Sequence, residues 1–461
     1  MVRFPQLAIL ALFALGSARA VVAADTSPLL PLGTELGDEA FYRPREAFRS
    51  EDKGGRKPYV VLLGDAAFSS PLLLGGRARA AGISCNTCHV NGTTNALLYV
   101  PGLSTRSGNF DTTNALFNPH TDNGVIDPLN IPSLRGAHLL APYGHDGRTL
   151  SLTEFVRNVI VNEFAGDEPS HEILDAVVAY VDDIDFIPNP RIATAGRLTE
   201  EASQSELRGE ALFYKPFAQN PDLSCAGCHI PSAAFVDHRQ HDVGSGGLFK
   251  TPTLLNANDN APYFHDGRYT TYAQVVGYFD RTFSLKLSAQ DRQDLVAYLH
   301  AIGDGQQSVM PDTIDAHTKE ITDFMSVLDT AIPQKDAEAS LLAIDAVDRE
   351  LRELTEYFPD ARDPTLSDGV PQRLQARGAV KGLVLDLREV ADKLKAARSE
   401  EALAALKLCR EDLAAAQPAL QAAQPYSLFD RKTHDAHFAA MRRLNRAATD
   451  PKLAPHRLDN D

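Results

Sequence analysis

Two copies of the pattern C-x-x-C-H constrain this 461-residue chain more than any other feature of its sequence. The copies are Cys85-Asn-Thr-Cys88-His89 and Cys225-Ala-Gly-Cys228-His229. This spacing is the attachment signature of c-type haem. Two cysteines three residues apart lie on one side of a helical turn, so both thiols can reach the vinyl groups of one porphyrin. The histidine that follows can then ligate the iron. We therefore predict two covalently bound haem c groups, with His89 and His229 as proximal ligands.

Other uses of a C-x-x-C pair are a thioredoxin-like redox motif, a structural disulfide and half of a zinc site. The histidine directly after both pairs disfavours all three. The fifth cysteine, Cys409, has no sixth cysteine to pair with. A single cysteine in a helical sequence is typically a small buried hydrophobic residue.

The N-terminus has the pattern of a secretory signal peptide, which we assign to residues 1–24. Arg3 precedes an apolar run over 7–15, and small residues follow, so cleavage is expected after Ala20 or Ala24. The run is shorter than the roughly 20 residues that span a bilayer, so we expect export to the periplasm and no membrane span. A net charge of −16 disfavours nucleic acid and anionic lipid as partners.

The sequence around each haem motif repeats, which indicates an internal duplication. Residues 63–68, 130–135 and 141–148 match residues 208–213, 250–255 and 261–268. Each copy continues with a helix that opens near Ser151 or Thr271, and it closes with a helix of amphipathic spacing, at 172–184 and 289–302. We predict an all-α protein with two cytochrome c-like haem domains in tandem, at 25–195 and 196–308.

Residues 309–461 are rich in Ala, Leu, Glu, Lys and Arg and contain no haem motif. Five amphipathic runs predict helices at 313–331, 335–357, 371–398, 399–423 and 434–446, with breaks at Pro333, 360–369 and Pro425. This part is predicted to be an antiparallel helical bundle. It serves either docking and oligomerisation, including homo-oligomer formation, or structural packing alone.

Residues 55–305 resemble the bacterial di-haem cytochrome c peroxidase family, which includes the MauG-type enzymes. The resemblance implies that the haem on His89 reacts with peroxide and that the haem on His229 relays electrons from a small cytochrome c or cupredoxin. It also implies a calcium ion between the domains. Oxygens of Asn260 and Pro262 would ligate this ion together with an asparagine after the first haem motif, for which Asn114 is the candidate.

The chain departs from this family at several positions that matter for the chemistry. The distal ligand of the second haem, Met or Tyr in relatives, aligns with Phe279, so the adjacent Tyr278 is our candidate ligand. The acid/base glutamate aligns with Thr153, one residue before Glu154, and a nearby glutamine aligns with Tyr143. No methionine occurs between Met1 and Met310, and the chain has no tryptophan.

Peroxide cleavage needs a group that accepts one proton and delivers another. Glu154 and His145 are the candidates, although Glu154 also suits a solvated first helical turn. The motif from His145 to Arg148 has a structural alternative, because Asp-Gly favours a turn and an arginine neutralises haem propionates. Arg148 and Arg268 are the candidate propionate partners. Three further histidines could supply a distal ligand to the first haem: His120, His138 and His171.

These patterns favour a periplasmic di-haem oxidoreductase that reduces hydrogen peroxide, or a related small oxidant. Two alternatives remain open at the level of sequence. One is MauG-like oxidation of side chains on a partner protein, which Tyr278 as a ligand would favour. The other is a non-catalytic electron-transfer subunit, which the replacements at Thr153 and Tyr143 favour.

Overall fold

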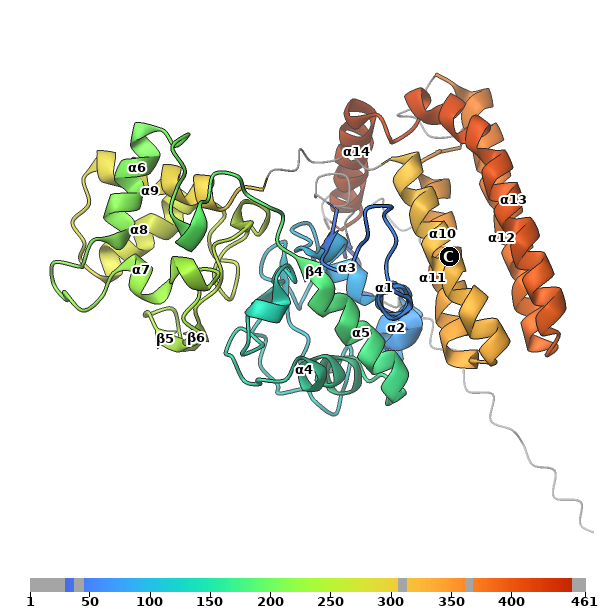
Figure 1. Ribbon diagram of the computed structural model, residues 1–461, viewed down its shortest axis with the longest axis horizontal. Coiled ribbons are helices and arrows are strands. Elements are labelled where there is room, and N and C mark those ends of the chain that lie inside the picture. The colour runs from blue at the N-terminus through green and yellow to red at the C-terminus, as the bar shows by residue number, and fades with distance from the viewer. Residues whose placement is uncertain (1–29, 37–44, 306–312, 361–367, 450–461) are drawn as a thin grey trace, which may run out of the picture.

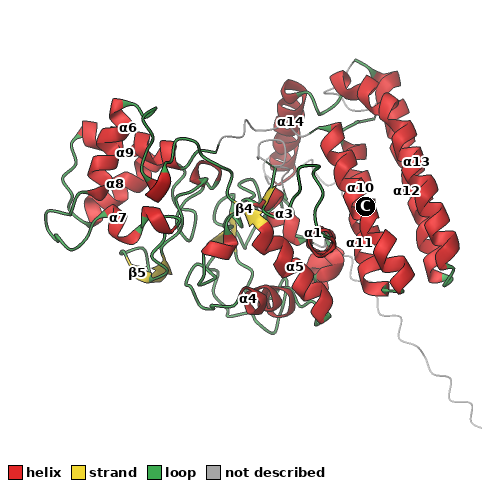
Figure 2. Ribbon diagram, viewed as in Figure 1, coloured by secondary structure: helices red, strands yellow, loops and turns green. Residues whose placement is uncertain are grey.

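The computed structural model describes residues 30–36, 45–305, 313–360 and 368–449, so the predicted signal peptide lies outside the described residues. The fold is mostly helical, as predicted, and the few strands form short two-stranded pairs (Figure 2). Three parts follow one another along the long axis of the molecule (Figure 1). The part around the second haem motif lies at one end, the part around the first lies in the centre, and α10 to α13 lie at the other end.

The central part, the first repeat unit, is built on two helices that cross closely. They are α1 (Tyr59–Ser69) and α5 (His171–Asp183). Gly64 lies at the crossing, where a β-carbon would come within 2.0 Å of the Ala176 carbonyl oxygen. Only glycine therefore allows this helix separation.

The second repeat unit reproduces the same crossing with α6 (Gln204–Tyr214) and α9 (Ala289–Ile302). Here a β-carbon on Gly209 would lie 2.0 Å from the Asp294 carbonyl oxygen. The predicted sequence repeat is thus a repeat of backbone geometry, because the two crossing helices and their contact glycine recur 145 residues apart.

The remaining elements of the two units are short. The helices are α2 (Gly76–Ala80), α3 (Cys85–Cys88), α4 (Leu152–Asn158), α7 (Cys225–Cys228) and α8 (Tyr272–Thr282). A single π-helical turn, Val159–Glu163, continues α4. The antiparallel strand pairs are β1 (Ala47–Phe48) with β4 (Ile184–Asp185), β2 (Asn109–Phe110) with β3 (Leu129–Asn130), and β5 (Gln240–Asp242) with β6 (Leu248–Lys250). Single 3-10 turns lie at Pro71–Leu73, Val90–Gly92, Ala137–Leu139, Thr194–Gly196, Pro231–Ala233, Ala257–Asp259 and Gln424–Tyr426.

The C-terminal part is a set of long helices close to the predicted ones. They are α10 (Ile314–Gln334), α11 (Ala337–Glu356), α12 (Val370–Lys395), α13 (Ser399–Ala423) and α14 (Arg431–Thr449). Pro333 lies in the last turn of α10 rather than after it, and the helix ends at Lys335 in the left-handed conformation. Cys409 is fully buried on α13, as expected for a small hydrophobic residue.

The helices α10 and α11 pack on α1, so the buried side chains of the first repeat unit and of α10 to α13 form one continuous cluster. The second repeat unit has a separate cluster of its own. Polar contacts also cross to the bundle: Arg45 pairs with Glu320 at 2.8 Å, and Ser70 Oγ donates to Asp345 at 2.6 Å. The bundle is therefore attached to the first unit by both apolar and polar contacts.

Replacing either crossing glycine by alanine should be strongly destabilising. We expect Gly64→Ala and Gly209→Ala to cost about 2–3 kcal/mol each, because backbone atoms of the facing helix must move. Gly382→Ala is the matched control, since a β-carbon there meets nothing within 4 Å. In the interior of α12 it should stabilise by about 0.5–1 kcal/mol. Urea unfolding followed by circular dichroism measures all three, and a neutral effect of both crossing substitutions would contradict the close helix contact.

Candidate haem sites

The first haem motif forms a single helical turn that begins after Ser84. The Ser84 backbone N–H donates to Thr87 Oγ1 at 3.0 Å, which fixes the start of α3. His89 follows the turn, and its Nδ1 lies 3.0 Å from the Pro132 carbonyl oxygen. A ring N–H on Nδ1 that donates to a carbonyl leaves the Nε2 lone pair available, which is the arrangement typical of metal-ligating histidines.

The second haem motif has the same geometry. Ser224 Oγ accepts from the Gly227 N–H at 3.0 Å at the start of α7. The Nδ1 atom of His229 lies 3.2 Å from the Phe235 carbonyl oxygen. Among the described residues, none of the four motif cysteines forms a disulfide, so all four thiols are available for thioether bonds.

Aromatic rings back both histidines at matching distances. The ring centroids of Phe68 and His89 are 6.4 Å apart, as are those of Phe213 and His229. Burial lowers the pKa of His89 to about 4, and burial also lowers the pKa of His229. Both imidazoles are thus held neutral, the form that ligates iron. Each unit therefore offers two thiols and one oriented imidazole, which fits one haem c.

Tyr278, the candidate distal ligand of the second haem, lies on α8. Its hydroxyl donates to the Val243 carbonyl at 2.7 Å, and its ring contacts Phe264 edge-on at 4.9 Å. Phe279, the aligned position, stacks on Phe283 at a centroid distance of 6.0 Å. The Tyr278 oxygen is therefore fixed by a backbone carbonyl in this structure, and ligation would require that bond to break.

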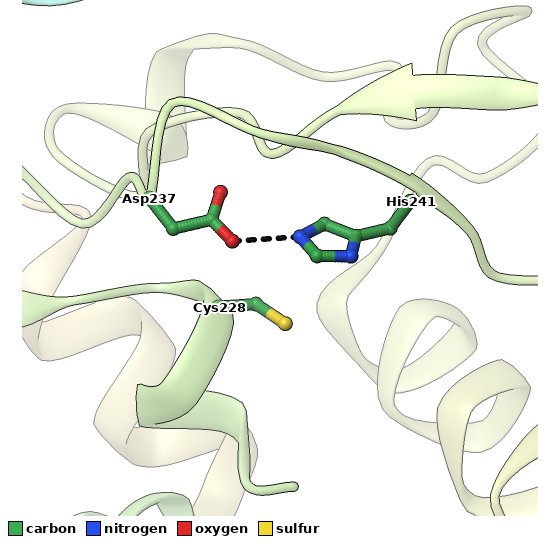
Figure 3. A group of neighbouring side chains, drawn as sticks. All are labelled: Cys228, Asp237 and His241. Atoms are coloured by element: carbon green, nitrogen blue, oxygen red, sulfur yellow. Dashed lines mark hydrogen bonds and ion pairs between the residues drawn. The ribbon is translucent and has the colours of Figure 1, made fainter.

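A group that sequence reasoning did not assign lies beside the second motif. One ligand atom each of Cys228, Asp237 and His241 lie within 4.8 Å of one another, and Asp237 Oδ2 is 2.6 Å from His241 Nε2 (Figure 3). Although burial acts in the opposite direction, hydrogen bonds from His241 and Thr251 hold the pKa of Asp237 below its usual value. Such a set could hold a metal ion, but a thioether bond at Cys228 would remove the thiolate. With haem attached through Cys228, the imidazole–carboxylate pair of His241 and Asp237 would remain close to the attachment site.

The two candidate propionate arginines each pair with the aspartate of their own motif. Arg148 lies 3.2 Å from Asp146, and Arg268 lies 2.9 Å from Asp266. Arg148 also pairs with Glu163 at 3.1 Å. Both guanidinium groups are partly exposed, so a propionate could replace the aspartate contact or add to it.

His145 is partly buried at the contact between the two repeat units, where its carbonyl accepts from the Lys250 N–H. Its Nε2 donates to the Asn130 carbonyl at 2.7 Å, and burial lowers the pKa of the imidazole to about 4. A neutral ring whose Nε2 is engaged by the backbone is suited to a structural role. Of the three further histidine candidates, His120 and His171 are exposed and His138 is partly buried.

Two glutamates near the first haem motif differ in their surroundings. Glu154 is exposed in the first turn of α4, where it accepts from Thr149 Oγ1 at 3.0 Å. Glu163 ends the π-helical turn, and its carboxylate is 13% exposed. Its Oε2 accepts from Thr112 at 2.8 Å, and its Oε1 accepts from Arg148. Sequence reasoning missed Glu163; π-helical turns are frequent at functional sites but leave no clear sequence signal.

The structure also identifies an asparagine other than Asn114 beside the predicted cation position. Asn114 Nδ2 donates to the Asp111 carbonyl within its own loop. Asn130 Nδ2 instead donates to the Pro262 carbonyl at 2.5 Å. Among the described residues, the buried Oδ1 atoms of Asn130 and Asn260 accept no hydrogen bond. Asn130 therefore fits the role that the sequence comparison gave to Asn114.

Comparison with known proteins finds a local similarity to di-haem cytochrome c peroxidases. Residues 203–333 match the family model described as di-haem cytochrome c peroxidase. A 79-residue stretch is 37% identical to the cytochrome-c peroxidase IdrP1 of Pseudomonas sp. (strain SCT), and a stretch of the same length is 34% identical to the cytochrome c peroxidase Ccp of Escherichia coli. Over this part, the chain is therefore similar to the bacterial di-haem cytochrome c peroxidase and MauG family.

The similarity is local to part of the relatives. The chain covers 20% of the Pseudomonas peroxidase and 17% of the E. coli peroxidase, with 15% and 16% of its own length. It is also 26% identical over 244 residues to hydrazine synthase subunit gamma of Kuenenia stuttgartiensis, covering 39% of this chain and 66% of that subunit. A solved structure of Kuenenia stuttgartiensis hydrazine synthase matches with a TM-score of 0.39 and 22% identity, covering 64% of this chain and all of that one.

The lowered pKa of His145 predicts how the stability of the fold depends on pH. Its pKa is lower in the folded chain than in the unfolded one, so the unfolded chain binds more protons between about pH 4 and 6.5. Stability should therefore fall as pH drops through this window, by up to about 3 kcal/mol from this group. His145→Gln keeps an N–H donor without titrating there and should flatten the dependence. Thermal unfolding at pH 7, 5.5 and 4.5 measures it, and the exposed His120→Gln, as a control, should not change the slope.

Proposed function

We propose that this chain is a periplasmic di-haem c-type oxidoreductase. It reduces hydrogen peroxide, or a related small oxidant, with electrons from a small redox protein such as a cytochrome c or a cupredoxin. The observation that carries the proposal is the repeated site. Each unit presents two free cysteines and a neutral histidine whose Nδ1 is held by a carbonyl, at 3.0 Å for His89 and 3.2 Å for His229. The similarity of residues 203–333 to di-haem cytochrome c peroxidases supports this class of reaction.

Haem bound at these two sites would supply one-electron chemistry and an iron position open to a small oxidant. The chain provides the covalent and steric frame. The thiols at 85, 88, 225 and 228 would fix each ring, and the backbone carbonyls would orient the two imidazoles. The buried rings of Phe68 and Phe213 pack beside the two histidines. Arg148 and Arg268 would offset the charge of the propionates.

Proton transfer at the first site is best assigned to Glu163. Its side chain is largely buried, fixed by Thr112 and ion-paired with Arg148, so it would lie near the propionate that this arginine would hold. It could accept a proton at one oxygen while the other keeps a hydrogen bond. Glu154 is exposed and bonded within its own turn, which suits a helix start better than catalysis.

A calcium ion would fit at the contact between the units. The buried Oδ1 atoms of Asn130 and Asn260 and the carbonyl of Pro262 are the oxygen donors that calcium prefers. Turning the Asn130 amide would exchange its Nδ2 for Oδ1 at Pro262, since the two atoms are assigned only from their hydrogen bonds. Bound calcium would then join the two repeat units.

A second candidate function is that of an electron-transfer subunit of a larger redox complex. The match to hydrazine synthase subunit gamma spans 244 residues, whereas each peroxidase match spans 79. The helices α10 to α14 would then serve docking. MauG-like oxidation of a partner protein is a further variant, favoured if Tyr278 ligates the second iron.

Glu163→Gln separates the enzyme from the subunit. We expect the reduced di-haem protein to react with hydrogen peroxide faster than free haem does, and Glu163→Gln to slow this step about 100-fold or more, because proton transfer is lost. Glu154→Gln is the control and should react like the parent. Stopped-flow absorbance measures the rates. A rate equal to that of free haem in the parent protein would favour the electron-transfer subunit, and mass spectrometry without two added haem masses would reject the haem sites themselves.

Tyr278→Phe tests the distal ligand of the second haem. If the Tyr278 oxygen ligates iron, the substitution should remove one low-spin signal from the electron paramagnetic resonance spectrum of the oxidised protein. If the hydroxyl instead remains on the Val243 carbonyl, the spectrum should be unchanged. Phe279→Leu serves as the control, because that ring has no ligating atom.

A further inference from the structure

The contact between the two repeat units is reciprocal and follows the 120-residue offset between positions 130 and 250. The Asn130 N–H donates to the His265 carbonyl at 2.7 Å, and the Lys250 N–H donates to the His145 carbonyl at 2.9 Å. Asn130 corresponds to Lys250, and His145 corresponds to His265. In each unit, the N–H at position 130 or 250 therefore donates to the histidine carbonyl of the other unit's His-Asp-Gly-Arg loop.

The side chains of Lys250 and Asn130 also contact corresponding carbonyls in the other unit. Lys250 Nζ donates to the carbonyls of Leu140 and Pro142, at 2.9 and 2.7 Å. The repeat makes Asn260 and Pro262 the counterparts of those two residues. Asn130, the counterpart of Lys250, contacts the Pro262 carbonyl at 2.5 Å. The carbonyl at position 142 thus faces an ammonium, whereas its counterpart at position 262 faces a neutral amide.

The two sides differ in the number of oxygen atoms that they offer. Beside the ammonium, position 140 is a leucine and adds no side-chain oxygen. On the other side, Asn130 and Asn260 each contribute a buried Oδ1 atom that accepts no hydrogen bond from the described residues. The side without a lysine therefore has two more oxygen atoms than the side with Lys250. This is expected if a free cation binds there.

Lys250 is suited to be a permanent charge. Burial lowers its pKa to about 8, which still leaves the ammonium mostly protonated at neutral pH. Among the described residues it forms no ion pair with a carboxylate. Its ammonium donates to backbone carbonyls, the ligand type that a cation would use.

We propose that the Lys250 ammonium takes the place of a bound cation in the first repeat unit. It lies at the carbonyls of Leu140 and Pro142, and the corresponding position in the second unit, between Asn130, Asn260 and Pro262, binds a free cation. This inference extends the calcium site proposed above and does not depend on the reaction with peroxide. Lys250 is then a positioning residue, which holds the loop carrying Tyr143 and His145 without any ion. The matching loop of the second unit depends on the ion instead.

Calcium stoichiometry tests this directly. The haem-loaded protein is dialysed against calcium, and bound calcium is measured by emission spectroscopy. We expect one ion per chain in the parent and two in Lys250→Asn, because that change recreates the amide oxygen of the other side. Lys250→Met removes the charge without adding an oxygen and should remain at one, as should Lys215→Asn, which alters an exposed lysine. Absorbance of both haems confirms that each variant is folded.

The reciprocal variant keeps the test decisive if Lys250→Asn fails to fold. Asn130→Lys should bind no calcium, and its thermal midpoint should not change with EGTA, whereas the parent midpoint should fall. A single ion in folded Lys250→Asn, calcium retained in Asn130→Lys, or no calcium in the parent would each overturn the inference. None of these results would alter the peroxide rates, so the two proposals fail separately.

Discussion

The orientation of one imidazole in each repeat unit is the constraint on which the rest of the structure depends. An iron site needs the histidine after the second cysteine to present Nε2, and the backbone secures this by accepting the Nδ1 proton, at Pro132 for one ring and Phe235 for the other. Both carbonyls belong to loops, and the Phe235 ring packs on Phe213 of the crossing helix α6. The crossing helices approach closely only because residues 64 and 209 are glycines. Site and scaffold are therefore specified together in both copies.

In the first unit, a buried ion pair and a tyrosine hydrogen bond support the helices behind the haem motif. Lys57 and Asp65 form a buried ion pair of 2.7 Å beside α10, and Tyr180 donates to Glu46 at 3.2 Å. Burial raises the pKa of the Asp65 carboxyl, which the Lys57 ammonium only partly offsets. Tyr180 packs on Phe68 at 5.0 Å. Contacts therefore run from the bundle to the ring behind His89, and breaking such a buried pair typically costs about 3–5 kcal/mol.

Much of the fold could be predicted from sequence because its signals are local or repeated. The spacing of the cysteines and histidines, the duplicated motifs and the helical periodicity of the C-terminal part each depend on neighbouring residues. Five predicted C-terminal helices match the structure within a few residues, and 399–423 matches fully. The crossing helix predicted at 289–302 also matches.

The parts that sequence could not give depend on contacts between distant residues. Position after a motif makes Asn114 the candidate in sequence, whereas the contact of Asn130 with Pro262 spans 132 residues and has no local signal. Glu163 ends a π-helical turn that places it beside Arg148, and no residue pattern predicts such a turn. His145 was considered for acid/base chemistry because the interface that buries it is formed by the other repeat unit.

The shared cluster of α1, α5 and the C-terminal helices has a consequence for biogenesis. In sequence, the whole second unit is inserted between the two stretches, 61–184 and 314–429, that build this cluster. Because synthesis runs from the N-terminus, all residues of the inserted core are made before the last residues of the larger core. The core around the second C-x-x-C-H motif can thus close first, whereas the core around the earlier motif waits for the C-terminal helices.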